Sequence, residues 1–354
     1  MNRGSWSVRA PTTTGPSPPE EALVLWSDVN IAGSGSWIPP IRPRAGARPD
    51  TPSAADANGF GSAAVATMGD TAVGMAARAA LKALRHADAV GPDLSLLVHA
   101  GFQDVDHYTP SPYLLRALGT TTAAGMEIGA ASDGGAAALV TAAEHLTARP
   151  DARAAMVTAG SRFPAERWDF VHEIGYLAGD AGGAAVLTRA PGRARLVATA
   201  HAAVPHLEEM SRAAAGVAGG AAGRRMAVEQ TGLARHVVSL QEATRSCVEQ
   251  VLEEAGLGPS DVAHTAVVAI GSAVLDVLLS GPPLHARAAD TSWTFGRHVA
   301  HAGPCDLLLA VDRLLRGGTV VTGDRVLVVS FGLGFRWTAA VLEITTPVRE
   351  RTAA

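Results

Sequence analysis

Residues 125–146 read GMEIGAASDGGAAALVTAAEHL, and this stretch sets the interpretation of the rest of the chain. The pattern predicts an apolar strand, a turn at Ala130–Asp133 and then a helix of small residues. The first turn of a helix has free N–H groups and a partial positive charge, so it can stabilise a negatively charged oxygen. Ser132 lies at this junction, where a serine is most often only a helix cap.

A second junction of the same kind lies near the C-terminus. Residues 295–318 read FGRHVAHAGPCDLLLAVDRLLRGG. They predict a loop that contains His301, then a helix that starts near Pro304 and ends before Gly317. Proline early and glycine late are typical of helix ends. Asp306 lies in the first turn of this helix, where an acidic residue ordinarily compensates the helix dipole.

Three pairs of similar segments predict a duplicated α/β unit. The pairs are residues 83–101 with 251–271, the strands that end at Gly160 and Gly332, and residues 183–188 (GAAVLT) with 338–343 (TAAVLE). They occur in the same order in both parts of the chain. We therefore expect two similar halves that meet near residue 191.

The duplication gives the expected boundaries of the chain. They are a disordered tail rich in Pro, Thr and Ser (1–22), an N-terminal half that contains Ser132 (23–190), a C-terminal half that contains His301 and Asp306 (191–346) and a short tail (347–354). The first strand is expected at Ala22–Ile31, followed by a turn at GSGSWIPP, residues 33–40.

The duplication also places Ser132 and His301 opposite each other. They are 169 residues apart, which matches the repeat spacing, so the two junctions would face each other between the halves. A serine hydroxyl needs a base, and a histidine base needs an acceptor that orients it, for which Asp306 is available. His298 is an alternative base that the sequence leaves open. Cys305 is expected on the buried side of the following helix.

Composition excludes several classes of function. The 354 residues carry a formal net charge of −4, which gives no cationic surface for nucleic acid. No uncharged apolar run reaches the ~18 residues that span a bilayer, and the first residues lack the apolar core of a signal peptide. Cys247 and Cys305 form neither a disulfide framework nor a metal-binding pattern. We expect a soluble cytoplasmic protein without a metal.

Three segments, in order, carry a resemblance to a known family. They are MEIGAASDGG (126–135), GYLAGDAGGAAVL (175–187) and SFGLGFRWTAAVLEI (330–344). They are similar to the nucleophile segment, the FGDGAGAAVL turn and the FGGGFTWGAALV segment of the ketoacyl-ACP synthase III branch of the thiolase superfamily, and the resemblance covers roughly residues 24–346. It implies the duplicated, five-layered αβαβα thiolase fold and a homodimer. It also implies an acyl-CoA or an acyl carrier protein with its phosphopantetheine thioester as substrate, and no other cofactor.

The departures from the family are informative. Ser132 stands at the position of the nucleophilic cysteine, and Ile270 stands where the family has a histidine. The family's asparagine loop is replaced by HAGPCD, and this H-x-G-x-x-D arrangement resembles a subgroup in specialised metabolism that loads polyketide starter units or transfers acyl groups. Leu333 replaces the middle glycine of FGGGF, and its backbone N–H together with that of Ser132 would form the oxyanion hole.

These departures favour acyl transfer over carbon–carbon bond formation. Decarboxylative condensation needs two neutral donors to hold an enolate, and Ile270 cannot donate, whereas a histidine followed by an acid suits proton removal from an O–H or N–H group. We expect an acyltransferase of polyketide or antibiotic biosynthesis, with Ser132, His301 and Asp306 as catalytic residues and a small-molecule hydroxyl, amine or carrier as acceptor. The alternatives are a starter-unit ketosynthase III and a catalytically silent partner subunit.

Overall fold

The structure is a computed structural model of the chain, and it describes residues 25–43, 58–101, 109–163, 177–208 and 233–346. The expected tails, 1–22 and 347–354, lie outside these described residues. The strands are β1 (Asn30–Trp37), β2 (Ile41–Pro43), β3 (Ser62–Ala64), β4 (Leu94–Gly101), β5 (Ala124–Ile128), β6 (Ala154–Ser161), β7 (Ala181–Thr188), β8 (Ala194–Ala203), β9 (Val262–Val267), β10 (Arg325–Gly332) and β11 (Arg336–Ile344). The α-helices are α2 (Ala72–Ala87), α3 (Pro110–Leu118), α4 (Gly134–Ala148), α7 (Leu233–Ala255), α8 (Ser272–Leu279), α9 (Trp293–Val299) and α10 (Asp306–Arg316).

The large sheet has the order β5-β4-β6-β7-β1-β8-β11-β10-β9. Corresponding strands of the two halves occur in reverse order on the two sides of the β1–β8 pair. In the N-terminal half β4 and β6 are parallel, while β7 is antiparallel to both β6 and β1. In the C-terminal half β9 and β10 are parallel, while β11 is antiparallel to both β10 and β8. The predicted segment pairs correspond to β4 with β9, β6 with β10 and β7 with β11. The predicted duplication of the fold is therefore confirmed.

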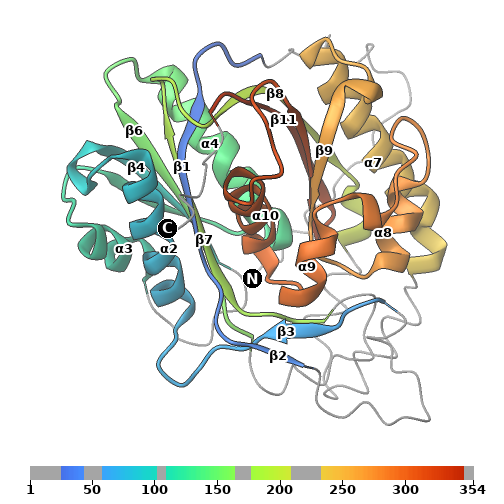
Figure 1. The fold of residues 1–354 in the computed structure, drawn as a ribbon, viewed down its shortest axis with the longest axis horizontal. Coiled ribbons are helices and arrows are strands. Elements are labelled where there is room, and N and C mark those ends of the chain that lie inside the picture. Colours follow the sequence, from blue (N-terminus) through green and yellow to red (C-terminus); the bar gives the residue numbers. More distant parts are fainter. Residues whose placement is uncertain (1–24, 44–57, 102–108, 164–176, 209–232, 347–354) are drawn as a thin grey trace, which may run out of the picture.

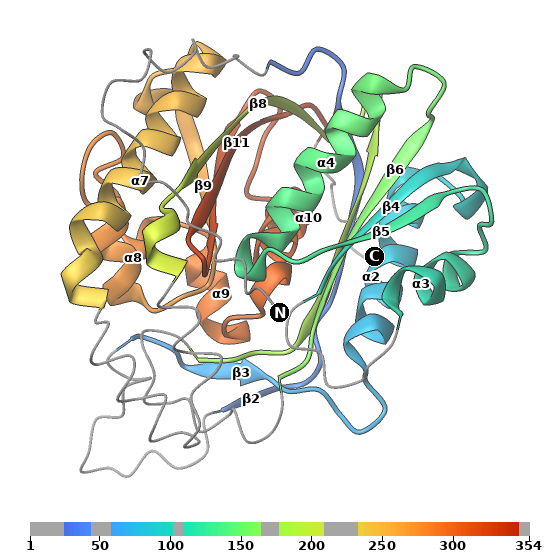
Figure 2. The ribbon, with the colours of Figure 1, turned by 180° about the vertical axis from the view of Figure 1, so that it is seen from behind.

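The two halves of the sheet diverge, and helices fill the space between them (Figures 1 and 2). The strands β1 and β8 pair only through Asn30 with Arg195 and Ile31 with Ala194. Helices α2 and α3 cover the outer face of the first half, and α7 and α8 cover that of the second. Helices α4 and α10 lie in the middle, where each contacts strands. This is the predicted five-layered αβαβα arrangement.

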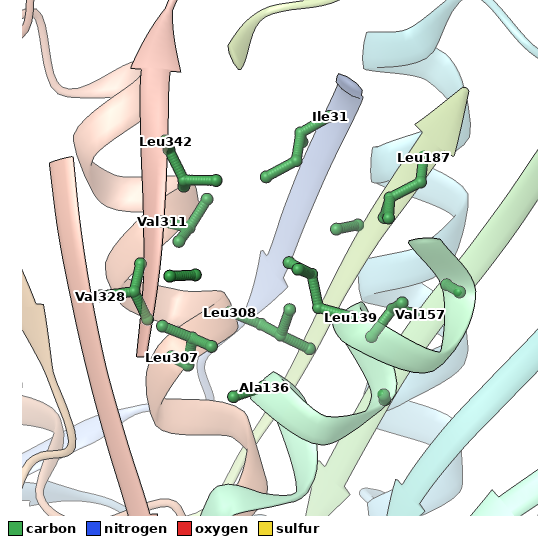
Figure 3. Packing of buried hydrophobic residues seen from close by; sticks show 14 of the residues in the cluster. Ile31, Ala136, Leu139, Val157, Leu187, Leu307, Leu308, Val311, Val328 and Leu342 are labelled. Atoms are coloured by element: carbon green, nitrogen blue, oxygen red, sulfur yellow. The ribbon is translucent and has the colours of Figure 1, made fainter. Parts of the chain in front are cut away.

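Apolar packing between the sheets fixes the two central helices. In α4 the residues between Gly134 and Ala143 are buried except Thr141, as expected for a helix with sheets on two sides. Figure 3 shows Leu139 of α4 beside Leu308 of α10, with residues of β1, β7 and β10 around them. Burial of each leucine side chain contributes about 1.5–3 kcal/mol. The starts of α4 and α10 are thereby held next to each other.

The first strand differs from the prediction. It runs over Asn30–Trp37 rather than Ala22–Ile31, so most of the segment predicted as a turn is a strand. The glycines are there because α2 packs directly on the strand backbone: a Cβ atom at Gly33 would lie 2.4 Å from the Ala83 carbonyl oxygen, and one at Gly35 would lie 2.3 Å from that of Ala79. Glycine permits this close approach of helix and strand.

Candidate active site

Two helix starts meet at the centre of the molecule. The short 3-10 turn Ala131–Asp133 leads into α4, and the 3-10 turn Gly303–Cys305 leads into α10. A Cβ atom at Gly135 would lie 2.4 Å from the carbonyl oxygen of Pro304, so the first turn of α4 touches the loop before α10. The glycine pair GG after Ser132-Asp133 therefore serves close packing between the two halves.

Ser132, His301 and Asp306 form one chain of hydrogen bonds across this contact. The Ser132 Oγ lies 2.8 Å from the His301 Nε2, and the His301 Nδ1 lies 2.6 Å from the Asp306 Oδ2. The exposed fractions are 9% for Ser132 and 4% each for His301 and Asp306. With Nδ1–H donating to the carboxylate, Nε2 is left to accept the hydrogen bond of the serine hydroxyl. This serine–histidine–carboxylate geometry is the one that removal of a proton from a serine requires.

The Asp306 carboxylate binds two backbone N–H groups as well as the His301 ring. Its Oδ1 accepts a hydrogen bond from the Ala302 N–H at 2.7 Å, and its Oδ2 accepts one from the Ala269 N–H at 2.7 Å as well as that of His301. As the first residue of α10, it also lies where the helix dipole favours a negative charge. The carboxylate is thus held in one orientation by backbone groups from two segments.

The backbone of His301 is held by the N-terminal half. Its N–H donates to the Leu177 carbonyl at 2.7 Å, and its carbonyl accepts from the Gly179 N–H at 2.9 Å. The residue before it, Ala300, has a φ of 70°, a conformation that is uncommon for a residue other than glycine. These contacts fix the register of the loop, and the imidazole reaches Ser132 as a result.

The alternative base is not near the serine hydroxyl. His298 is an exposed residue of α9, and its backbone carbonyl accepts a hydrogen bond from the Ser62 hydroxyl at 2.8 Å. Its side chain lines a surface cavity of about 520 Å³, whose described lining residues do not include Ser132. The hydrogen bond to Ser132 is made by His301 instead.

Cys305 is inaccessible, as the sequence predicted. Its side chain is fully buried, and its Sγ lies 3.3 Å from the Ala181 carbonyl oxygen. Burial, with the nearby Asp306 carboxylate, raises the pKa of the Cys305 thiol well above its ordinary value. A thiol that stays protonated is a poor nucleophile.

Two of the positions that depart from the family, Ile270 and Leu333, have distinct surroundings. Ile270 is half-buried among apolar residues, and its carbonyl accepts a hydrogen bond from the Trp293 Nε1 at 2.6 Å. Leu333 lies in the turn between β10 and β11 and is 40% exposed. The preceding Gly332 packs against the turn that carries Ser132. Leu333 therefore directly follows a residue that contacts the Ser132 turn.

Sequence reasoning missed one buried acid beside the nucleophile. Asp133 is fully buried, and its Oδ2 accepts hydrogen bonds from the Arg336 Nε at 3.0 Å and the Thr338 hydroxyl at 2.9 Å. Burial raises the pKa of the Asp133 carboxyl to about 6, against the opposing effect of Arg336. The signal that could have revealed this pair is Arg336, which stands at the threonine of the FGGGFTWG pattern.

Within the described residues, no group of three or more His, Cys, Asp or Glu side chains is placed to hold a metal ion. The helices described there are also too short or too polar to cross a bilayer.

Comparison with known proteins places the chain in a family. The family described as 3-oxoacyl-[acyl-carrier-protein (ACP)] synthase III C terminal matches residues 252–344. The β-ketoacyl-[acyl-carrier-protein] synthase III of Synechococcus sp. (strain WH7803) is 27% identical over 299 residues, which cover 82% of this chain and 86% of that protein.

Solved structures agree with this. The acyltransferase ChlB3 has 30% sequence identity and a TM-score of 0.80, and the match covers 91% of this chain and 99% of that one. The priming β-ketosynthase of the R1128 polyketide biosynthetic pathway has the same fold at 21% identity, with a TM-score of 0.71 over 93% of this chain and 100% of that one. The chain belongs to the ketoacyl-ACP synthase III-like family of the thiolase superfamily, whose members named here are synthases and an acyltransferase.

Proposed function

We propose that this protein is an acyltransferase of polyketide or antibiotic biosynthesis. It takes an acyl group from an acyl carrier protein or CoA thioester onto Ser132 and passes it to a hydroxyl, amine or carrier acceptor. The observation that carries the proposal is the hydrogen-bond chain from the Ser132 Oγ to His301 at 2.8 Å and on to Asp306 at 2.6 Å. The likeness to the acyltransferase ChlB3 supports it.

The first half-reaction acylates the serine. His301 Nε2 removes the hydroxyl proton while the Ser132 Oγ attacks the thioester carbonyl carbon. The oxyanion that forms would accept hydrogen bonds from the backbone N–H groups of Ser132 and Leu333, and Ser132 lies at the positive end of α4. Collapse of this intermediate breaks the carbon–sulfur bond, and the thiolate leaves with the proton held by His301.

The second half-reaction reverses these roles. His301 removes the proton of the acceptor hydroxyl, amine or thiol, and the acceptor attacks the carbonyl carbon of the acyl-serine ester. The Ser132 Oγ leaves and recovers its proton from His301. Asp306 stabilises the imidazolium in both halves, since its carboxylate lies 2.6 Å from the Nδ1.

The starter-unit ketosynthase remains the second candidate, because two of the relatives are named as synthases of that kind. The apolar side chain at Ile270 opposes it, since loss of one donor to a developing anion costs about 10²–10³ in rate. A silent subunit would not need a histidine hydrogen-bonded to Ser132 or an acid hydrogen-bonded to that histidine.

We also propose that the protein is a cytoplasmic homodimer that pairs through β5. This strand lies at the end of the sheet, residues 124–127 are exposed, and Met126 has an exposed fraction of 42%. An open, apolar edge strand is a ready partner for a second copy of the same strand.

Intact-protein mass spectrometry tests the proposed function. Wild-type protein is incubated with a set of acyl-CoA and acyl-N-acetylcysteamine thioesters, with Ser132→Ala as the matched control. We expect a mass increase equal to one acyl group in the wild type only. An adduct that persists in Ser132→Ala would refute the assignment. Rapid formation of a β-ketoacyl product from a malonyl carrier protein would favour the ketosynthase.

A further inference from the structure

We propose that Asp133 is a positioning residue that clamps the turn carrying Ser132 to the turn carrying Leu333, so that the two oxyanion-hole N–H groups keep a fixed separation. The inference rests on the proposed function, because it concerns the same acyl-serine site. It assigns a role to a side chain that takes no part in the chain of Ser132, His301 and Asp306.

The clamp is made by polar contacts between the two halves of the chain. Asp133 immediately follows the nucleophile, and its Oδ2 binds Arg336 at 3.0 Å and Thr338 at 2.9 Å. Both partners are on β11, at the end where the strand leaves the Leu333 turn. Arg336 pairs with Gly332 in the β10–β11 ladder, so the two residues that flank this turn are linked to each other and to Asp133.

Backbone packing also joins the end of β10 to the turn that carries Ser132. A Cβ atom at Gly332 would lie 2.6 Å from the Ala130 carbonyl oxygen and 2.8 Å from the Asp133 nitrogen. The strand end and the nucleophile turn therefore touch directly. Because Leu333 follows Gly332 and Ser132 precedes Asp133, any change in this contact shifts one oxyanion-hole N–H relative to the other.

The carboxylate is costly as a purely structural group. Asp133 has no exposed surface, and burial is the largest influence on its pKa, against the lowering effects of Arg336, Ser330 and Thr338. Burying a charged group is unfavourable even when it is hydrogen-bonded, and burial raises the pKa of this carboxyl to about 6. An asparagine could still accept the bonds of Arg336 and Thr338 without the charge. A buried ionisable group with a shifted pKa next to a reacting atom is typical of a functional position.

The negative charge of Asp133 strengthens its hydrogen bond to Arg336. A carboxylate bonds a guanidinium more strongly than a neutral amide does. The Arg336 side chain is 43% exposed, so without the charge it can turn towards water and release the end of β11. Arg336 also balances the negative charge of Asp133, which would otherwise oppose an oxyanion next to it.

A serine-directed fluorophosphonate tests the proposal, because its P=O oxygen needs the oxyanion hole. Ser132 attacks phosphorus, fluoride leaves, and His301 takes the serine proton. Labelling is followed by intact mass over a range of probe concentrations at pH 8, with the melting temperature measured on the same samples. The variants are Asp133→Asn, Asp133→Ala and Ser132→Ala. Asp312→Asn is the matched control, since Asp312 is a buried acid bonded by the Ser34 and Ser36 hydroxyls elsewhere on α10.

We expect Asp133→Asn to lower the maximal labelling rate by about 10- to 100-fold, because a small displacement in an active site can cost about 10²-fold. The probe concentration for half-maximal rate should change less than about twofold, and the melting temperature at pH 8 should be equal or higher. Asp133→Ala should lose at least as much rate. Asp312→Asn should melt earlier and label within about twofold of the wild-type rate.

The possible results separate the two proposals. A wild-type labelling rate in Asp133→Asn overturns the positioning role, and so does a rate loss that only follows a lower melting temperature. Labelling of the wild type that persists in Ser132→Ala, or no labelling at all, overturns the proposed function and the positioning role with it.

Discussion

The Oγ of Ser132 lies 2.8 Å from the Nε2 of His301, although the two residues are 169 positions apart in the chain. The contact exists because each residue occupies the corresponding helix start of one half of a duplicated fold. It follows that a substitution on either side should act on the same chemical step, and the next predictions use this.

Substitutions of Ser132 should decide whether an acyl group can be loaded onto the protein. Ser132→Ala should abolish the acyl adduct, because no hydroxyl remains to attack the thioester. Ser132→Cys should retain loading, because a thiol is the nucleophile usual in the fold. Both are checked by intact mass after incubation with acyl thioesters. An unchanged adduct in the alanine variant would show that another residue is acylated.

Replacing the base should slow acylation strongly. A positioned general base contributes about 10²–10⁴ in rate, so His301→Ala should lose acylation on that scale. His298→Ala is the control and should stay near the wild-type rate, since His298 is exposed on α9 and lines a separate cavity. The measurement is the single-turnover rate of acyl-enzyme formation. The reverse pattern would make His298 the base.

Replacing the orienting acid should affect both rate and stability. In Asp306→Asn the side-chain NH₂ must replace one oxygen that accepts from the Ala269 or Ala302 N–H. A buried donor left without an acceptor costs about 1–3 kcal/mol. We expect slower acylation and a lower free energy of unfolding in denaturant titrations. Wild-type acylation by this variant would reduce the triad to a Ser132–His301 pair.

Asp133 should make stability depend on pH. Its folded pKa of about 6 lies above the ordinary 3.8, so the folded state binds the proton more tightly. Protonated Asp133 therefore contributes at most about 3 kcal/mol to the free energy of unfolding. This contribution is fully present below pH ~4 and is lost as pH rises through ~6. The melting temperature of Asp133→Asn, relative to wild type, should therefore rise between pH 4 and pH 6.5 and stay level above that. A difference independent of pH would contradict the raised pKa.

Disrupting the edge strand should change the oligomeric state. Met126→Lys places a charge on the exposed edge of β5, and light scattering should then give a mass near the 36.1 kDa of one chain instead of twice that value. Leu81→Lys is a suitable control, because Leu81 is an exposed leucine of α2 with a similar exposed fraction of 39%. A wild-type protein that is already monomeric would refute the dimer.

The sequence predicted the parts of the fold that repeat. The similarity of β4 with β9, β6 with β10 and β7 with β11 predicted the layers and brought Ser132 and His301 face to face, because a duplicated fold repeats its helix starts. The catalytic roles of these residues remain predictions. The burial of Cys305 was also predicted from the sequence, because free cysteines are among the most often buried residues.

Other features depend on contacts that no local pattern contains. The glycines of β1 were interpreted as a turn, because glycine in a sequence signals flexibility unless one knows that α2 packs on that strand. The bond between Asp133 and Arg336 joins residues 203 positions apart, and although Arg336 departs from the FGGGFTWG pattern, nothing near it in the sequence points to Asp133. Only the register of β11 against the nucleophile turn brings them together.

The attachment of His301 to Leu177 and Gly179 has a consequence for the chain during synthesis. Ser132 is made early, whereas His301, its proposed base, is made 169 residues later, and the His301 loop is held by backbone hydrogen bonds to the N-terminal half. On the proposed mechanism, Ser132 of a nascent or truncated chain has no base within reach and stays unreactive towards thioesters. Ser132 would then become reactive only after both halves have folded.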